Sequence, residues 1–367
     1  MLAEATDGAQ IRGLVSEPLR NLFAQQGAAL PEAPELHDIL WGEGIHPQIS
    51  SEAEALLRDA EDIAPFTENA RIYKRGSAPE RLAFYALSRL LDRSADHRRQ
   101  ALLADLPTDT GSPLDSLTLS RESAVSLVSV QRWSVLDDAV NEAAEGFRIS
   151  GKESTTINPG KMFMTTARMA VPFFDSLMLK FARHPSVLRL VGRYLDGYPI
   201  LYRINLLRSS NEYLQDGSSQ FFHLDPEDYR QMKIFILIDD VDEDCGPLHL
   251  LAASATDEFR VKTGYRHGRL LDEQVSSVVG TDRLVRCTGA RGTMAFGDTS
   301  RCLHFGSRPG NRERFVAMIQ YMTPFAASYA LTPEGISGKY AQPFRDLCEA
   351  TGASSSVEDR CLYAVDR

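Results

Sequence analysis

The chain has 367 residues, of which 43% are hydrophobic and 25% are charged, proportions that are ordinary for a globular protein with a large buried core. Its net charge is −10 and its basic residues are scattered, which argues against a nucleic-acid partner, because a nucleic-acid-binding surface gathers lysine and arginine in one patch. The sequence shows no secretory signal and no run of roughly 18 apolar residues, so we expect a cytoplasmic protein that does not enter a membrane.

The five cysteines are odd in number, widely spaced and free of any C-x-x-C pair. This pattern favours reduced thiols over a disulfide framework or a zinc knot. Cys302 lies two residues before His304 and could be read as a metal ligand. We favour a buried thiol that packs as a small hydrophobe.

The first part of the chain is predicted to consist of helices and loops. Residues 51–62 and 79–92 carry apolar side chains at three- and four-residue spacing, and the second segment has a proline near its start. Pro31, Pro34 and the segment 41–47 are predicted to lie in loops.

A change of composition separates this part from the rest. The segment 105–116 is rich in Asp, Thr, Pro and Gly and is the best candidate for a boundary. We therefore predict a helical N-terminal region at residues 1–110, which could pack on the core, and a second domain at residues 111–367.

The second domain is predicted to begin with helices and to continue with strands. The helices fall at residues 131–145 and 171–194, and the second is interrupted at His184-Pro185, where proline restarts a helix. From Tyr198 onward, short apolar runs of strand type are separated by Gly, Asp, Pro and Asn. Many short strands at such spacing predict a sandwich or barrel, for which a double-sheet jelly roll is one solution. The runs are residues 200–207, 233–238, 248–251, 275–279, 283–286, 293–296 and 315–321.

The tripeptide His223-Leu224-Asp225 is the first segment that suggests chemistry. Side chains at i and i+2 of a strand point the same way, so His223 and Asp225 can reach one ion while Leu224 faces away. Taken alone, such a tripeptide is more often a buried strand histidine followed by an aspartate that starts a turn.

His304 and Arg314 strengthen the metal interpretation. Two imidazoles and one carboxylate on one face of a metal leave positions for a co-substrate and O₂, as in non-haem Fe(II) oxygenases. Arg314 begins an apolar strand and can form a bidentate pair with a carboxylate. Arg312 competes for this role, although it still lies in the turn before the strand.

The strand at residues 200–207 could supply a wall of the pocket through Tyr202, Arg203 and Asn205. Which of them point inward depends on the register, because a slip of one residue reverses every side chain.

The order of these motifs resembles the phytanoyl-CoA dioxygenase family of Fe(II)- and 2-oxoglutarate-dependent oxygenases. The resemblance covers residues 120–325 and leaves the N-terminal region unexplained. It implies an α+β fold with a double-stranded β-helix (jelly-roll) core flanked by helices. The segments that carry it are 181–199, 223–225 and 240–254, followed by His304 and Arg314.

The resemblance also implies a role for each motif residue, with no catalytic side chain beyond the metal ligands. The Fe(II) ligands would be His223, Asp225 and His304, and Arg314 would bind the far carboxylate of 2-oxoglutarate. Members often have Gly-Ser directly after the distal histidine. Here Phe305 intervenes, so Ser307 is shifted by one position and is a candidate partner of the same carboxylate.

The implied reaction is oxidation of a substrate C–H bond by O₂, coupled to conversion of 2-oxoglutarate into succinate and CO₂. Halogenating relatives replace the ligand carboxylate with a small residue, whereas this chain keeps Asp225, which favours hydroxylation or a related oxidation. The expected substrate is a small molecule. Two alternatives stay open: a zinc hydrolase with the same ligands, which gives Arg314 no role, and an inactive jelly-roll binding protein.

Overall fold

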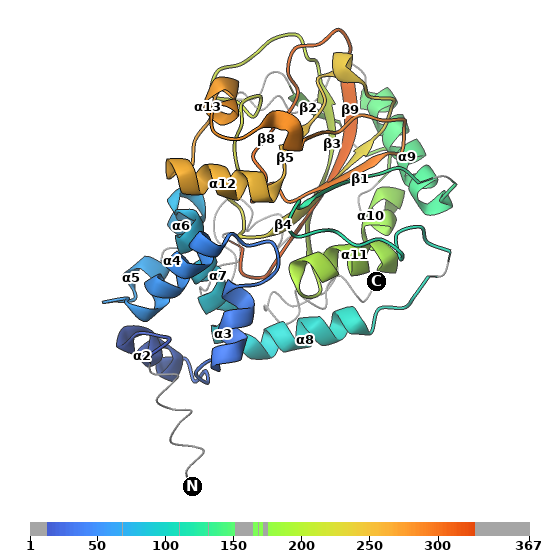
Figure 1. Cartoon of the computed structure of the whole chain (residues 1–367). Helices are drawn as coiled ribbons and strands as arrows, with labels where there is room; N and C mark the ends of the chain where they lie inside the picture. Colours follow the sequence, from blue (N-terminus) through green and yellow to red (C-terminus); the bar gives the residue numbers. More distant parts are fainter. Residues whose placement is uncertain are drawn as a thin grey trace.

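A helical N-terminal region precedes two antiparallel sheets in the computed structural model (Figure 1). The structure describes residues 13–67, 69–109, 111–130, 132–150, 164–167, 169–171 and 175–326. The N-terminal helices are α2 (Glu17–Gln25), α3 (Ala33–Leu40), α4 (Pro47–Arg58), α5 (Ala64–Thr67), α6 (Asn69–Arg75), α7 (Ala78–Leu91) and α8 (Arg93–Ala104).

Helix α7 lies at the centre of this region and is buried on nearly all sides. A capping box closes its first turn, in which the Ser77 hydroxyl accepts from the Glu80 N–H at 3.3 Å and the Glu80 carboxylate accepts from the Ser77 N–H at 2.6 Å. The predicted helix at residues 79–92 therefore matches α7 to within one residue.

The predicted helix at residues 51–62 is α4, which begins earlier than expected. Pro47 suits the first helical position, and the His46 ring accepts a hydrogen bond from the Gln48 N–H at 3.2 Å. The loop predicted at Pro34 is wrong, because this residue stands in the first turn of α3, where a proline is equally well tolerated.

The larger sheet has six strands in the order β1-β7-β4-β9-β3-β2, and every neighbouring pair is antiparallel. On strand β4, alternation sends Ile234 and Ile236 into the main apolar core, while Lys233, Phe235 and Leu237 line a cavity. The strands are β1 (Val125–Val128), β2 (Met164–Ala167), β3 (Ile200–Ser209), β4 (Gln231–Leu237), β7 (Met294–Gly297) and β9 (Arg314–Met322).

Helices α9 (Ser134–Ser150), α10 (Leu177–Ala182) and α11 (Pro185–Leu195) contact strands β3, β4 and β9 of this sheet. Their apolar side chains and those of the sheet form the main core cluster. The helix predicted at residues 131–145 is thus α9, shifted toward its C-terminus. The one predicted at residues 171–194 is α10 and α11, with the restart at Pro185 as expected.

The smaller sheet has the order β6-β5-β8 and lies beside helices α12 and α13 (Figure 1). Apolar residues of α12 and α13 pack on it, among them Phe259 and Val275. Together the two antiparallel sheets and their flanking helices confirm the predicted α+β, jelly-roll fold class. The elements are β5 (His249–Leu251), β6 (Leu284–Arg286), β8 (His304–Phe305), α12 (Ala253–Thr263) and α13 (Asp272–Ser276).

The strand predicted at residues 275–279 is wrong, because this segment belongs to helix α13 and the turn after it. Val275 and Val279 are both buried, and their spacing of four residues places them on one helical face. The Gln274 side chain also accepts a hydrogen bond from the Leu271 N–H at 2.8 Å, which stabilises the first turn.

Several contacts join the N-terminal region to the sheets. The Tyr73 hydroxyl donates to the carbonyl of Phe325 at 3.0 Å, and Arg301 donates to the carbonyls of Gly44 and Arg121. Tyr229 and Phe325 belong to the apolar cluster of the N-terminal helices. Among the described helices, none has the length and apolar character needed to cross a bilayer.

Candidate metal centre and its cavity

His223 and His304 face each other across an isolated antiparallel bridge. The His223 N–H donates to the His304 carbonyl at 3.1 Å, and the His304 N–H donates to the His223 carbonyl at 3.0 Å. Asp225 is held by a third backbone bond, from its N–H to the Thr299 carbonyl at 2.9 Å. These bonds bring together residues that are far apart in the sequence.

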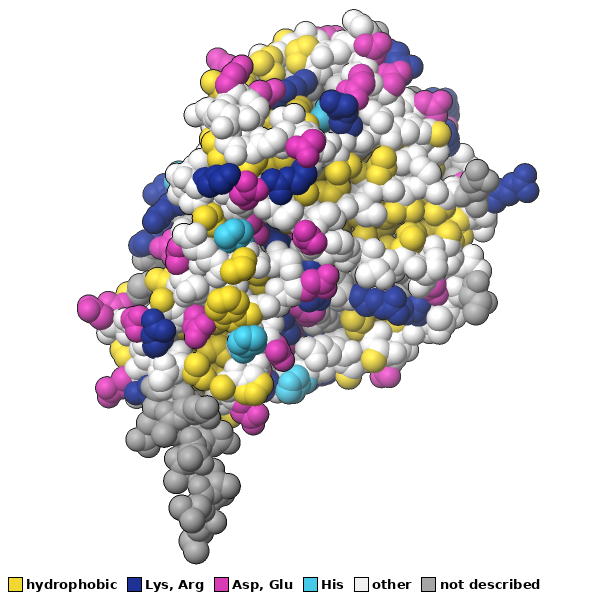
Figure 2. All heavy atoms as spheres, in the orientation of Figure 1, with side chains coloured by type: hydrophobic (Ala, Val, Ile, Leu, Met, Phe, Trp, Pro, Cys, Tyr) yellow, Lys and Arg dark blue, Asp and Glu magenta, His cyan; other side chains and the backbone are white. Residues whose placement is uncertain are grey.

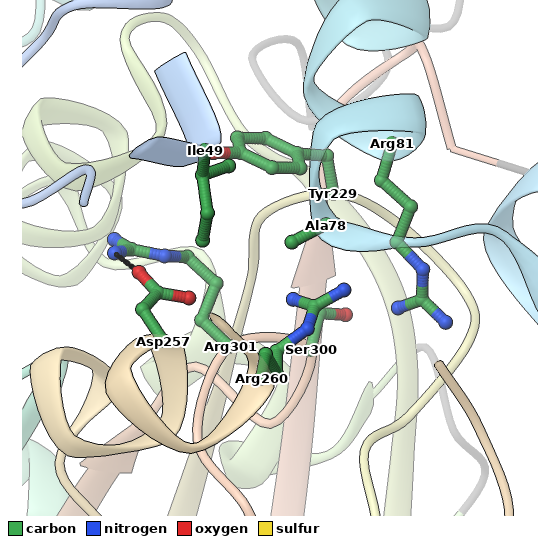
Figure 3. Close-up of a pocket in the computed structure, with 8 residues that line it drawn as sticks. All are labelled: Ile49, Ala78, Arg81, Tyr229, Asp257, Arg260, Ser300 and Arg301. Atoms are coloured by element: carbon green, nitrogen blue, oxygen red, sulfur yellow. Dashed lines mark hydrogen bonds and ion pairs between the residues drawn. The ribbon is translucent and has the colours of Figure 1, made fainter. Parts of the chain in front are cut away.

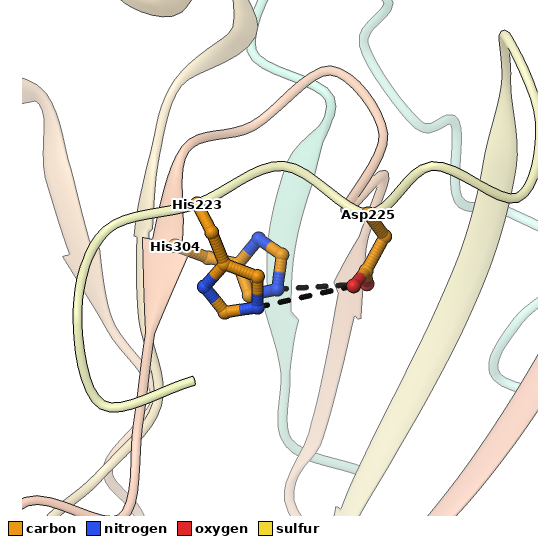
Figure 4. A group of neighbouring side chains, drawn as sticks. All are labelled: His223, Asp225 and His304. Atoms are coloured by element: carbon orange, nitrogen blue, oxygen red, sulfur yellow. Dashed lines mark ion pairs between the residues drawn. The ribbon is translucent and has the colours of Figure 1, made fainter. Parts of the chain in front are cut away.

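The three side chains converge on one point (Figure 4). Asp225 Oδ1 lies 3.8 Å from His223 Nε2, and Asp225 Oδ2 lies 3.5 Å from His304 Nε2. One possible ligand atom from each residue lies within 4.8 Å of the others. Within the described ranges, this is the one group of His, Cys, Asp and Glu side chains with such geometry.

Both imidazole rings are oriented by the same local hydrogen bond. His223 Nδ1 lies 2.9 Å from the Phe221 carbonyl, and His304 Nδ1 lies 2.9 Å from the Cys302 carbonyl. Because a carbonyl only accepts, each Nδ1 carries the proton and each Nε2 presents a lone pair to the shared point. Metal-binding histidines are commonly fixed in this way.

The charge states of the three groups suit a metal. Burial lowers the pKa of both histidines, so their rings are neutral near pH 7. Burial alone would raise the pKa of Asp225, but the charge of Lys233 and its hydrogen bond outweigh burial and hold that pKa well below the usual range. Neutral imidazoles and an ionised carboxylate are the forms that coordinate metal ions.

Lys233 is a residue of this site that the sequence pattern does not single out. Its Nζ lies 2.6 Å from Asp225 Oδ2, and both side chains are largely buried. The feature of the sequence that could have identified Lys233 is its position in an otherwise apolar strand, on the same face of β4 as Phe235 and Leu237. A charge in that position needs a partner, which only the fold identifies.

A cavity of about 120 Å³ opens beside the three side chains. Strand β3 contributes Leu207 and Ser209 to its wall, and alternation places Arg203 and Asn205 on that same face. Tyr202 instead packs near Ile200 and Met322. Residues from both sheets complete the wall, including Leu248, Phe235, Gly306, Ser307, Arg314 and Met318.

Arg314 projects into this cavity without a carboxylate partner among the described residues. It is 9% exposed, and burial lowers its pKa to about 10. One guanidinium nitrogen donates to the Ser307 hydroxyl at 2.8 Å, and that hydroxyl lies 2.7 Å from the Ser209 hydroxyl. The buried Nε of Arg314 has no hydrogen-bond partner among the residues that the structure describes. A buried guanidinium in this state favours an anion in the cavity.

Arg312, the alternative to Arg314, and Cys302, the alternative metal ligand, both lie away from this cavity. Arg312 is on the surface, where it pairs with Asp242 at 2.6 Å. The Cys302 thiol is buried and points toward the carbonyls of Ser123 and Ala124, at 3.6 and 3.8 Å. Neither side chain lines the cavity.

Comparisons with known proteins were made by sequence and by structure. No family model matches the chain, and no curated protein sequence matches it. Among solved structures it is similar to the non-heme alpha-ketoglutarate-dependent carbocyclase SnoK from nogalamycin biosynthesis, at 14% identity over 63% of this chain and 98% of that chain, with a TM-score of 0.43.

Two other solved structures are also similar to the chain. The apo form of EctD from S. alaskensis matches at 13% identity over 59% of this chain and 79% of that chain, with a TM-score of 0.41. HygX from Streptomyces hygroscopicus, solved with nickel, 2-oxoglutarate and hygromycin B, matches at 15% identity over 55% of this chain and 84% of that chain, with a TM-score of 0.35. Likeness of this extent describes part of a fold, and the chemistry has to be inferred from the side chains.

Proposed function

We propose that this protein is an Fe(II)- and 2-oxoglutarate-dependent oxygenase that oxidises a C–H bond of a small molecule. The main support is that three potential metal ligands and a buried arginine face one cavity. The ligands are His223, Asp225 and His304, and the guanidinium of Arg314 has no carboxylate partner among the described residues. The ordered sequence motifs further support a place in the phytanoyl-CoA dioxygenase family.

The donor set suits Fe(II). Two imidazole nitrogens and one carboxylate on one side of an ion leave coordination positions open toward the cavity. A dicarboxylate that occupied those positions with its keto-acid end could pair its other end with Arg314 and the Ser307 hydroxyl.

Iron and 2-oxoglutarate, when bound, would supply the oxidation, in which O₂ gives one oxygen atom to the substrate and one to succinate as CO₂ leaves. The residues of the chain have other tasks. The two rings and Asp225 hold the metal, the backbone carbonyls of Phe221 and Cys302 keep Nε2 of each ring turned toward it, and Arg314 orients the co-substrate. The apolar wall, including Phe235 and Leu248, excludes water.

We infer a small-molecule substrate and no nucleic-acid partner. The cavity of about 120 Å³ is of a size for small ligands. On the face drawn in Figure 2, basic and acidic side chains are interspersed and no basic stripe is visible. Phosphate backbones are bound by surfaces on which positive charges gather.

The test is succinate formation by anaerobically purified protein supplied with Fe(II), 2-oxoglutarate and then O₂. We expect slow succinate production even without the natural substrate, and its loss in His223→Ala and Asp225→Ala. The Arg312→Met variant, which changes a surface arginine, is the control and should still produce succinate. Hydrolytic activity with zinc that does not depend on 2-oxoglutarate, or no binding of iron at all, would contradict the proposal.

A further inference from the structure

A second, smaller cavity lies between the N-terminal helices and the sheets (Figure 3). Helix α7 contributes Arg81, helix α12 contributes Asp257 and Arg260, and the segment after β7 contributes Ser300 and Arg301. Tyr229, Ile49 and Ala78 complete the wall. None of these residues lines the cavity of the candidate metal centre.

The charges in this cavity do not balance. Arg301 pairs with Asp257 at 3.4 Å, but within the described parts of the chain no carboxylate lies within ion-pair distance of Arg81 or Arg260. Arg81 is only 2% exposed and Arg260 only 6%. The charge of Asp257 also attracts Arg260, but one carboxylate does not balance the three arginines of the cavity, and buried guanidinium groups are costly because water cannot solvate them fully.

The unpaired polar atoms of the cavity are donors. Arg81 Nε and Nη1, Arg260 Nε and Nη2, and the Ser300 hydroxyl are all buried and have no hydrogen-bond partner in the described structure. Figure 3 shows the side chains of Arg81 and Arg260 reaching from their two helices toward the same space. Burial and the nearness of Arg260 lower the pKa of Arg81 to about 9, which agrees with two positive groups close together. A guest that only accepts hydrogen bonds suits this lining.

The size of the cavity restricts that guest. The cavity volume is about 10 Å³, which is room for about one water molecule. A phosphate or an organic acid has several heavy atoms and would not fit without displacing side chains. A single-atom anion is the smallest guest that supplies the missing negative charge. A chloride ion is somewhat larger than a water molecule and needs only a small outward shift of the arginine side chains to fit.

We propose that the cavity binds one chloride ion, held by Arg81, Arg260 and the Ser300 hydroxyl. The site is separate from the proposed function and does not depend on it. The ion would tie α7 of the N-terminal region to α12 of the jelly-roll domain. Two residues of its lining are also close in sequence to the metal-ligand candidates, since Tyr229 follows Asp225 by four residues and Ser300 precedes His304 by four.

Thermal unfolding of the full-length protein in potassium chloride and in potassium gluconate, at matched concentrations, tests the proposal. Gluconate is too large for the cavity, so we expect chloride to raise the Tm by a few degrees in a saturable manner. Arg260→Met should lose this difference. Arg58→Met, which removes an exposed arginine of α4, should keep it.

Crystals soaked in bromide provide a measurement that needs no variant. We expect one anomalous peak between the guanidinium groups of Arg81 and Arg260. Equal Tm values in chloride and gluconate, a chloride effect that survives in Arg260→Met, or a bromide-soaked crystal without that peak would each overturn the proposal. If Arg260→Met does not fold, the bromide peak decides.

Discussion

Arg314 is the residue that separates the proposed oxygenase from other uses of the same three metal ligands. We expect Arg314→Met to raise the KM for 2-oxoglutarate about 10- to 100-fold, because a charge-assisted pair contributes about 1.5–3 kcal/mol. Metal binding should be unchanged, since Arg314 contacts none of the ligand side chains in the described structure. Steady-state kinetics and metal titration measure the two quantities.

Thermal unfolding gives an independent check of the same residue. Added 2-oxoglutarate with a divalent metal should raise the Tm of the wild type and have little effect on Arg314→Met. Arg312→Met is the matched control, because it removes a neighbouring arginine that is paired on the surface. If both variants lost the effect equally, Arg314 would not be the co-substrate residue.

Asp228 should make stability depend on pH. Burial raises its pKa to about 8, although the N–H groups of Tyr229 and Thr323 each donate to it at 2.7 Å. An unfolded aspartic acid titrates near pH 4, so between about pH 4 and pH 8 the native state holds a proton that the unfolded state has lost. The free energy of unfolding should therefore fall as pH rises through this window, by at most about 1.4 kcal/mol per pH unit.

Comparison with Asp228→Asn isolates this effect from all other titrating groups. Asparagine cannot ionise, and it keeps one of the two acceptors at a cost of about 1 kcal/mol. Urea unfolding should show the variant as the less stable protein near pH 5, with the gap closing or reversing near pH 8. A gap that is constant with pH would contradict the raised pKa.

The sequence identifies some of these residues and not others, for a physical reason. His223, Asp225, His304 and Arg314 belong to a spaced pattern that a reader of the sequence can find. The pairing of Lys233 with Asp225, and the juxtaposition of the two arginines of the smaller cavity, join residues from separate elements. Only the three-dimensional arrangement shows such pairs.

At the scale of elements, Gly246 fixes the turn between β4 and β5. Its φ is +54°, and a Cβ at this position would lie 2.3 Å from the Arg308 carbonyl oxygen. Its carbonyl also accepts from the Ser307 N–H at 3.1 Å, and Ser307 holds Arg314. We expect Gly246→Ala to lower the free energy of unfolding by more than about 2 kcal/mol, measured by urea unfolding.

Gly217→Ala is the control for backbone strain without crowding. Gly217 has a φ of +68°, but no heavy atom lies within 4 Å of the point that an alanine methyl group would occupy. At this position only the left-handed backbone conformation should destabilise an alanine variant, so we expect the free energy of unfolding to fall by about 1 kcal/mol. If both variants lost the same free energy of unfolding, the carbonyl of Arg308 would not be what excludes a side chain at position 246.

In the second domain, the long strands are easier to predict than helix α12. Strands β3, β4 and β9 alternate between the core and the cavity, and their apolar runs are visible in the sequence. Helix α12 is not apparent from the sequence, because its buried residues include Thr256, Asp257 and Arg260, so its inner face lacks an apolar stripe. The polar inner face of this helix is the wall of the smaller cavity.

At the scale of the whole molecule, the predicted division near residue 110 can be tested by truncation. The rings of Tyr85 and Tyr229 lie 4.9 Å apart, and those of Tyr85 and Phe325 lie 6.0 Å apart, so the jelly-roll domain contributes to the apolar cluster of the N-terminal helices. We expect a protein of residues 111–367 to expose the rings of Tyr229 and Phe325 and to aggregate.

Size-exclusion chromatography with light scattering measures the outcome, and a co-expressed fragment of residues 1–110 serves as the control. The two fragments together should recover a particle of the mass of the full chain. A truncated protein that is monomeric and unfolds at the same temperature as the full chain would show that the N-terminal region is dispensable for folding.

The strand order of the larger sheet has a consequence for synthesis on the ribosome. Strand β9, among the last of the described strands to be made, lies between β3 and β4, and β1 pairs only with β7. Until Arg314–Met322 has emerged, β3 and β4 each expose an unpaired edge, which other chains can bind. Translation that stops shortly before Arg314 would therefore leave an aggregation-prone product, and not merely an inactive one.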